Sequence, residues 1–257
     1  MEHITEPIAA ELAAFEAFFE QSLKADTEPM DSIMRYVAAT KGKRLRPILV
    51  LLSAKLLGEV NEKTLRAATF VEMVHSATLI HDDVVDGSDL RRGQASVKTQ
   101  FGNLSAVLSG DYLLSKAMLL IANDADILNE MLRTTAAMSE GELMQNSSFL
   151  QPGCKKDEYL DIITRKTALL MRSCCVAGAL SVNATEEQIR QIADFGLNFG
   201  ILFQLRDDIL DGENTETAQA LLPEYLEKTL EALRLFPFSE TLEVLNDLTV
   251  FCAERQG

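Results

Sequence analysis

The sequence predicts an all-α protein that forms a single domain over residues 1–257. Apolar residues recur at spacings of three and four along most of the chain, which is the period of an amphipathic helix. Only 13 glycines and 6 prolines occur in 257 residues, and this disfavours a loop-rich or all-β protein. No segment alternates apolar and polar residues as strands do, and 47% hydrophobic residues suffice for a sizeable core.

The predicted helices follow one another closely along the chain. The third is apolar almost throughout and is therefore expected at the centre of the fold. Asn61 or Thr64 can cap the fourth helix, and Thr185 with Gln188 forms a capping-box pattern before a later one. The expected helices cover residues 5–24, 29–40, 47–57, 64–86, 104–121, 127–149, 157–180, 185–211 and 222–233, with a closing helix that ends at 255.

Two aspartate triads of the same spacing close two of these apolar helices. The first and last aspartates of a triad are four residues apart and share one helix face. Carboxylates this close repel one another unless a cation or solvent separates them. One triad could be a solvated helix end, but two copies predict carboxylates that bind Mg²⁺ across a cavity, with a diphosphate completing the metal shell. The triads are Asp82, Asp83 and Asp86, and then Asp207, Asp208 and Asp211.

Basic residues gather at two places in this acidic chain. The segment KGKRLRP, which starts at residue 41, would place Lys43, Arg44 and Arg46 around a helix N-terminus, a ready anion site. Arg91 and Arg92 follow the first triad and could neutralise phosphate charge that metals do not reach. A solvated basic face is the simpler alternative for the first group.

Single histidine and cysteine residues carry less information. His75 lies two helical turns before Asp82, about 10 Å along the same face. It could be a hydrogen-bonded core residue or a contact for phosphate. The adjacent Cys174 and Cys175 are expected to be small buried residues. Metal-ligand spacing is lacking in all four cysteines: Cys154, Cys174, Cys175 and Cys252.

Charge and hydropathy exclude several classes of partner. A net charge of −15 and a pI near 4.7 disfavour nucleic acid and electrostatic docking on anionic lipid. No apolar run approaches the length of about 18 residues needed to cross a membrane, so no integral membrane segment is expected. Without a disulfide framework or a visible signal peptide, the expected location is the reducing cytoplasm.

Seven short motifs occur in one order along the chain: GKRLRP, HDDVVD, LRRG, GDYLLS, GELMQ, KTA and FQLRDDILD. With them the chain resembles the trans-polyprenyl diphosphate synthases, from about residue 30 to 211 and again over the closing helix. The resemblance implies an isoprenoid-synthase helical bundle around a central cavity, as a homodimer. It also implies Mg²⁺-dependent, head-to-tail condensation of an allylic diphosphate with isopentenyl diphosphate, which gives a medium- or long-chain all-trans polyprenyl diphosphate.

The resemblance assigns a role to each matching residue. The first triad would bind Mg²⁺ together with the allylic diphosphate, and the second would bind the remaining metal. Metals and cations would stabilise charge on the departing diphosphate, so no protein nucleophile is required. The residues on which catalysis would depend are Asp82, Asp83, Asp86, Lys166 and Asp207. The allylic-diphosphate side would comprise Arg91, Lys166, Thr167 and Gln204. The isopentenyl-diphosphate pocket would comprise Lys43, Arg46, His75 and Arg92.

Two further features concern product length and completeness. Ala77 and Thr78 are small residues beneath the first triad, which predicts room for a product of about C30 or more. After Asp211 the family continues with a lysine and a Gly-Lys-Pro-x-Gly-x-Asp-like stretch. Here the next lysine is Lys228, on the expected surface of an amphipathic helix, so a family segment is expected to be missing after residue 211.

Two alternatives compete with a polyprenyl synthase. A terpene cyclase of the same fold generally lacks the isopentenyl pocket and the second aspartate triad, so Lys43, Arg46 and the paired triads argue against it. A non-catalytic or partner-dependent subunit of a heteromeric prenyl synthase fits the segment missing after Asp211. Intact acidic and basic motifs argue against that second alternative, because a scaffold has no need of clustered carboxylates.

Overall fold

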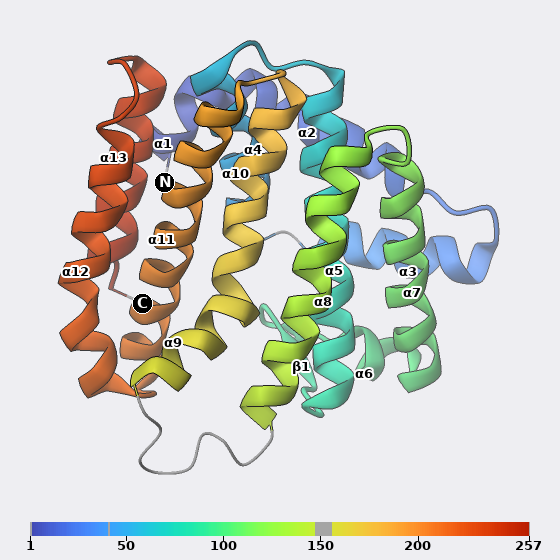
Figure 1. Ribbon diagram of the computed structural model, residues 1–257. Coiled ribbons are helices and arrows are strands. Elements are labelled where there is room, and N and C mark those ends of the chain that lie inside the picture. The colour runs from blue at the N-terminus through green and yellow to red at the C-terminus, as the bar shows by residue number, and fades with distance from the viewer. Residues whose placement is uncertain (1, 41, 147–155, 257) are drawn as a thin grey trace.

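The chain folds into a bundle of helices, as the sequence predicts (Figure 1). The computed structural model describes residues 2–40, 42–146 and 156–256. The long helices are α2 (Ala9–Leu23), α3 (Glu28–Ala39), α4 (Leu45–Leu57), α5 (Glu62–Val85), α7 (Asn103–Leu120), α8 (Ala125–Asn146), α10 (Leu169–Ser181), α11 (Glu186–Asp211), α12 (Thr215–Leu233) and α13 (Glu240–Glu254). Shorter elements are α1 (Glu2–Thr5), a 3₁₀ turn (Glu6–Ile8), the hairpin β1 (Leu90–Arg91) and β2 (Gln94–Ala95), α6 (Val97–Phe101), α9 (Lys156–Ile163) and a π-helical segment (Thr164–Ala168).

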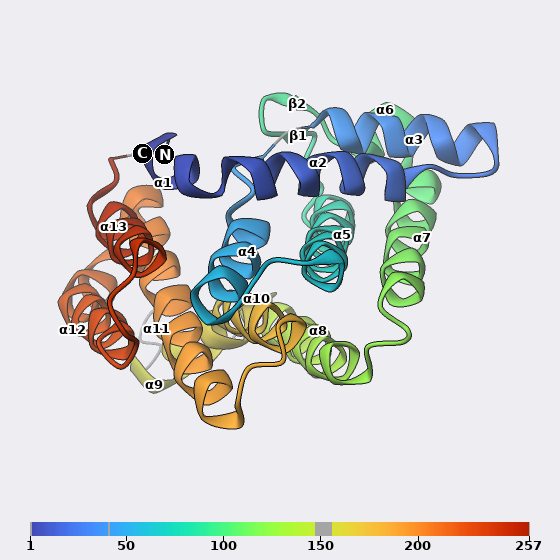
Figure 2. The same ribbon diagram turned by 90° about the horizontal axis from the view of Figure 1, so that it is seen from above.

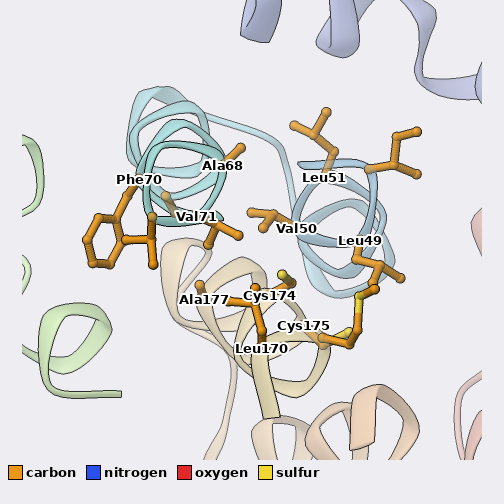
Figure 3. Close-up of a cluster of buried hydrophobic side chains, with 14 of the residues drawn as sticks. Leu49, Val50, Leu51, Ala68, Phe70, Val71, Leu170, Cys174, Cys175 and Ala177 are labelled. Atoms are coloured by element: carbon orange, nitrogen blue, oxygen red, sulfur yellow. The ribbon is translucent and has the colours of Figure 1, made fainter. Parts of the chain in front are cut away.

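Helices α4, α5 and α10 form the centre of the bundle. Seen from above, α7 and α8 lie on one side of them and α11, α12 and α13 on the other, while α2 and α3 cross one face (Figure 2). Side chains such as Val50, Val71 and Ala177 are fully buried where the three central helices meet (Figure 3). The apolar run that begins at Pro47 is therefore a central helix, as expected.

The cysteines contribute to this core rather than to a metal site. Cys174 and Cys175 lie on α10 and are fully buried, and Cys252 on α13 is also buried; all three are free thiols. The prediction of small buried residues is confirmed for Cys174 and Cys175. Cys154 lies outside the described residues.

Helix caps fix where the two helices that carry the aspartate triads begin. Asn61 is the N-cap of α5 and Thr64 is its partner in a capping box, and Thr185 with Gln188 forms the second box at the start of α11. From these caps both helices run to the lower end of the bundle in Figure 1. The two triads, although far apart in sequence, therefore lie at the same end of the molecule.

The helix predicted over residues 157–180 is interrupted by the π-helical segment Thr164–Ala168. A π turn adds one residue to a turn and is often found at functional sites. Here it contains Lys166 and Thr167, two of the predicted site residues.

The predicted helix over residues 222–233 begins earlier, at Thr215, and follows α11 after a short link. Gly212 ends α11 with a φ of 77°, a left-handed conformation that glycine adopts without strain. At the point where a family segment is expected to be missing, the chain therefore turns directly from one helix into the next. Lys228 is exposed on α12 and pairs with Glu224 at 2.7 Å, which confirms its predicted surface position.

Within the residues that the structure describes, the helices are all too short or too polar to cross a membrane. The predicted helix over residues 127–149 is found as α8, and its last predicted residues lie outside the described part of the chain.

Candidate active site

The first aspartate triad ends helix α5. Asp82 is partly buried and lines a cavity, Asp83 is only 2% exposed, and Asp86 is the exposed C-cap. The buried Asp83 accepts a hydrogen bond from Nε of Arg91 at 2.9 Å and a second from the same guanidinium. A two-pronged arginine contact of this kind fixes a carboxylate in place.

A short hairpin after the triad positions the two arginines. Arg91 lies in β1, and Arg92 and Gly93 form the turn with φ of 52° and 77°, the two left-handed conformations typical of a tight hairpin. The turn directs Arg91 toward Asp83, whereas the Arg92 guanidinium lies against Gly42. A side chain at residue 42 would occupy the space of that guanidinium, so glycine there lets Arg92 keep this position. The sequence did not predict this hairpin.

A cavity of about 420 Å³ opens between α5, α8 and the π-helical segment. We call it the acid cavity; its wall includes Thr78, Asp82, Glu142, Lys166 and Thr167. Nζ of Lys166 lies 2.9 Å from Glu142 Oε2. Burial and the nearby charge of Glu142 raise the pKa of Asp82 to about 6, although Lys166 opposes the shift. A cation bound beside Asp82 would therefore stabilise the charged form of this carboxylate.

The second triad ends helix α11 in a hydrogen-bonded chain. Asp208 is 6% exposed and accepts from the Tyr159 hydroxyl and, at 2.8 Å, from Nε2 of Gln204. Gln204 Oε1 accepts from the Thr167 hydroxyl at 2.8 Å. Because burial raises the pKa of Tyr159, this residue remains a donor. These hydrogen bonds, from Asp208 through Gln204 to Thr167, link the second triad to the wall of the acid cavity.

The remaining aspartates of the second triad are more accessible. Asp207 is paired with the guanidinium of Arg255, from the end of the chain, and Asp211 is exposed. Burial raises the pKa of Asp207, and Arg255 partly offsets this. Lys166 favours the charged forms of both Asp82 and Asp208, so one ammonium group acts on both triads.

A second cavity, of about 550 Å³, collects positive charge. We call it the basic cavity. Nε of Arg46 is buried and has no hydrogen-bond partner among the described residues, which suits an anion that would accept from it. Burial, followed by the charges of Arg46 and Arg92, lowers the pKa of His75 well below its usual range, so His75 is neutral at pH 7. All four residues predicted for the isopentenyl pocket line this cavity: Lys43, Arg46, His75 and Arg92.

Arg44, predicted with Lys43 and Arg46 around the start of α4, also lines the basic cavity, but its guanidinium is paired with two carboxylates. Its side chain is buried, with Nε 2.8 Å from Glu16 Oε1 and Nη1 2.7 Å from Glu72 Oε1. The guanidinium also lies 4.9 Å from the centroid of Phe19. The buried charges of Arg44 and Glu72 neutralise each other. Arg44 therefore anchors the segment that carries Lys43 and Arg46.

Arg91 and Gln204 line neither cavity and contact Asp83 and Asp208 instead. The predicted site residues on the two cavity walls are Lys43, Arg46, His75, Asp82, Arg92, Lys166 and Thr167. Arg46 and His75 line both cavities and therefore connect them. Sequence reasoning assigned no role to Glu142, Tyr159 and Arg255. Glu142 lies in the GELMQ motif, which was a usable signal, whereas no local pattern marks Tyr159 or Arg255.

The donor set suits a hard divalent cation, because the triads supply carboxylate oxygens and no sulfur. In the described part of the chain, no three His, Cys, Asp or Glu side chains converge into a ready-made metal cage. Mg²⁺ is usually held by one or two carboxylates with water and substrate phosphates, and the triads supply such carboxylates. The residues therefore fit a metal that is shared with a diphosphate.

Comparison with known proteins gives a consistent result. The family model described as polyprenyl synthetase matches residues 27–220. The octaprenyl diphosphate synthase of Haemophilus influenzae is 38% identical over 191 residues, which are 74% of this chain and 58% of that protein. That of Escherichia coli is 32% identical over 213 residues, 82% of this chain and 66% of that protein. The chain thus spans 58% to 66% of the length of these relatives.

A solved structure matches the whole fold. The polyprenyl synthase of Caulobacter crescentus, in a complex with calcium and isoprenyl diphosphate, superposes with a TM-score of 0.92 at 27% identity. The match covers 100% of this chain and 98% of that one. The helices around both cavities are therefore arranged as in a protein that binds a divalent cation and an isoprenyl diphosphate.

Proposed function

Because this chain belongs to the polyprenyl synthetase family, we propose that it is a prenyltransferase. The reaction would be Mg²⁺-dependent, head-to-tail condensation of an allylic diphosphate with isopentenyl diphosphate to an all-trans polyprenyl diphosphate. The proposal rests on one observation. Both aspartate triads lie at the same end of the bundle (Figure 1), where the acid cavity and the basic cavity share Arg46 and His75 in their walls.

The acid cavity suits the allylic diphosphate. Asp82 and Asp86 would hold Mg²⁺ from one side and Asp207 and Asp211 from the other, with Asp83 and Asp208 as buried anchors. When bound, Mg²⁺ withdraws negative charge from the leaving diphosphate. Lys166 and Arg91 would add positive charge as the C–O bond breaks, and the Thr167–Gln204 pair would hold Asp208.

The basic cavity suits isopentenyl diphosphate. Lys43, Arg46 and Arg92 would bind its diphosphate, and the double bond would attack the allylic carbocation from there. His75 is neutral because of its lowered pKa, so it would donate a hydrogen bond without adding charge. A proton then leaves the new chain, and the released diphosphate is the base at hand. The surrounding apolar side chains would keep water from the carbocation.

Product length depends on the space beneath Asp82. Thr78 lies in the wall of the acid cavity, whereas Ala77 is fully buried in the adjoining core. A small residue at 78 leaves room for a growing chain, which supports a product of about C30 or more. Relatives named for eight- and nine-unit products fit this length, whereas three others, 30% to 34% identical, are named for the shorter geranylgeranyl product. Thr78→Phe would fill this space and shorten the product.

We also propose that the protein is a homodimer formed through α7. Large apolar residues lie exposed on this helix, which is at the edge of the bundle (Figure 2). Exposed apolar patches of this kind mark interaction surfaces. The residues are Leu104, Val107, Leu108, Met118 and Leu119. Light scattering of Leu108→Glu against the native chain tests it: a monomer is expected, and an unchanged mass would reject this surface.

A partner-dependent subunit remains the second candidate, since one relative is named component 2 of a heptaprenyl diphosphate synthase, from Geobacillus stearothermophilus. That relative is 33% identical over 81% of this chain. The short link between α11 and α12 also fits this candidate. We propose a cytoplasmic location for the protein, whether it is an enzyme by itself or a partner-dependent subunit.

The decisive experiment is incorporation of labelled isopentenyl diphosphate into lipid by the purified protein, with Mg²⁺ and a farnesyl diphosphate primer. A product ladder ending at about C30 or beyond is expected, and it should shorten in Thr78→Phe and vanish in Asp82→Asn. If the folded protein makes no product with Mg²⁺ present, the prenyltransferase proposal fails for the chain alone and the partner-dependent subunit is favoured.

A further inference from the structure

The end of the described chain is tied to the second triad by two reciprocal contacts. Nε of Arg206 donates to the main-chain carbonyl of Arg255 at 2.9 Å, and the Arg255 guanidinium in turn donates to Oδ1 of Asp207. The same guanidinium lies 4.3 Å from the centroid of the Phe203 ring. Only 15% of the Arg255 side chain is exposed. This ion pair is therefore held in place, unlike a loose surface pair.

Arg255 also belongs to the wall of the basic cavity, together with Lys43, Arg46 and Arg92. Its Nε is buried and has no hydrogen-bond partner among the described residues. A guanidinium carries five N–H donors, and a buried donor that stays unpaired costs free energy. Arg255 therefore has donor capacity left on a cavity whose charge suits an anion.

We propose that Arg255 is the resident counter-ion of the second triad and that it couples the two cavities. Before a diphosphate binds in the basic cavity, Arg255 neutralises Asp207 and weakens metal binding there. When the diphosphate enters, the guanidinium turns toward it and releases Asp207 to the metal. The inference rests on the proposed function and gives Arg255 the part of a positioning residue in it.

The coupling follows from charge. A guanidinium and a divalent cation on the same carboxylate repel each other, so each weakens the binding of the other. The diphosphate competes with Asp207 for the one guanidinium. Because coupling between two ligands is reciprocal, diphosphate in the basic cavity and metal at the second triad must then strengthen each other.

The first test measures metal binding directly. In Asp82→Asn/Asp86→Asn protein, which keeps the Asp83–Arg91 pair, bound Mn²⁺ is obtained from the electron paramagnetic resonance signal of the free ion. Arg255→Met in this background should bind Mn²⁺ on the order of tenfold tighter. Arg234→Met removes the same charge from an exposed position and should change nothing. Equal or weaker Mn²⁺ binding in Arg255→Met would overturn the proposal.

The second test needs no metal. Calorimetry with a chelator present measures the affinity for isopentenyl diphosphate in the native chain, Asp207→Asn, Arg255→Met and the double variant. Asp207→Asn frees Arg255 and should tighten binding about fivefold, and this gain should disappear when residue 255 is methionine. A gain that persists in the double variant would contradict the coupling.

Two controls separate the possible failures. Arg255→Lys keeps a cation without the planar fork, so it should fold as the native chain does and should shift Mn²⁺ affinity in the same direction by less. If neither the native chain nor any variant binds Mn²⁺, even with inorganic diphosphate present, the metal-dependent function itself fails. If Mn²⁺ binds equally to Arg255→Met and Arg234→Met, only the coupling fails.

Discussion

The two aspartate triads have the same spacing and the same pattern of burial, yet their neighbours differ. The middle aspartates, Asp83 and Asp208, are 2% and 6% exposed, and the last ones, Asp86 and Asp211, are exposed. This common pattern follows from helix geometry, since positions one and four residues apart face in fixed directions. The last aspartate shares a face with the first but stands at the end of its helix, as the C-cap of α5 or the last residue of α11, and is therefore more exposed.

The partners are distributed differently in the two triads. In the first, the cation Arg91 contacts the buried anchor Asp83, and Asp82 forms no salt bridge within the described residues. In the second, the anchor Asp208 is held by neutral donors, and the cation Arg255 contacts Asp207 instead. The first triad thus has an available carboxylate on its cavity, whereas the second has one already neutralised.

The largest expected effect of this difference is on catalysis. Asp82→Asn should lower kcat/KM by about 10³ or more, because it removes an available metal ligand. Asp207→Asn should lower kcat/KM by only about 10², because in the free protein Arg255 already holds this carboxylate and has to release it before a metal binds. Steady-state incorporation of labelled isopentenyl diphosphate measures both. Equal losses in the two variants would show that the different neighbours do not matter to the reaction.

Local patterns in the sequence predicted much of this arrangement. The capping boxes at Asn61 and Thr185 and the repeated apolar spacing placed α5 and α11 closely, and the repeated aspartates gave the triads. The resemblance, based on motifs in one order, assigned four residues to one pocket, and all four line a single cavity in the structure: Lys43, Arg46, His75 and Arg92. Their roles as ligands of a diphosphate stay predictions.

What the sequence did not predict depends on distant partners. Tyr159 and Arg255 lie 49 and 48 residues from the aspartates that they contact, so no local spacing reveals them. Arg44 has the charge of an anion ligand, but burial against Glu72 gives it a structural role. The π turn around Lys166 is also invisible to a helical period, because one extra residue per turn barely alters the apolar pattern.

The different anchors should be visible in stability as well. Tyr159→Phe removes a donor to the buried Asp208 and should destabilise the protein by about 2 kcal/mol, or lower Tm by roughly 4 to 8 °C. Tyr225→Phe is the matched control, since this buried tyrosine on α12 forms no hydroxyl hydrogen bond to the described residues. Thermal unfolding in metal-free buffer measures both. A loss no greater than in the control would mean that the hydroxyl does not anchor the triad.

The smallest expected effect is a dependence of stability on pH at Asp82. Its pKa rises from 3.8 in the unfolded chain to about 6 in the folded one, chiefly because of burial. The unfolded state therefore loses this proton first, and stability falls as pH rises from about 4 to 6. Without metal, Asp82→Asn should be more stable than the native chain by about 1 kcal/mol above pH 6, after allowing for solvent around this partly exposed carboxyl.

This difference should disappear below about pH 3, where Asp82 is neutral in both states. Denaturant unfolding from about pH 3 to 7.5 with a chelator present measures it, and Asp247→Asn, at an exposed position on α13, controls for the loss of one charge. A difference in stability that does not vary with pH would show that burial does not disfavour the charged form of Asp82. The gain in Asp82→Asn, together with its loss of activity, would mean that the first triad gives up stability to keep one carboxylate available for a cation.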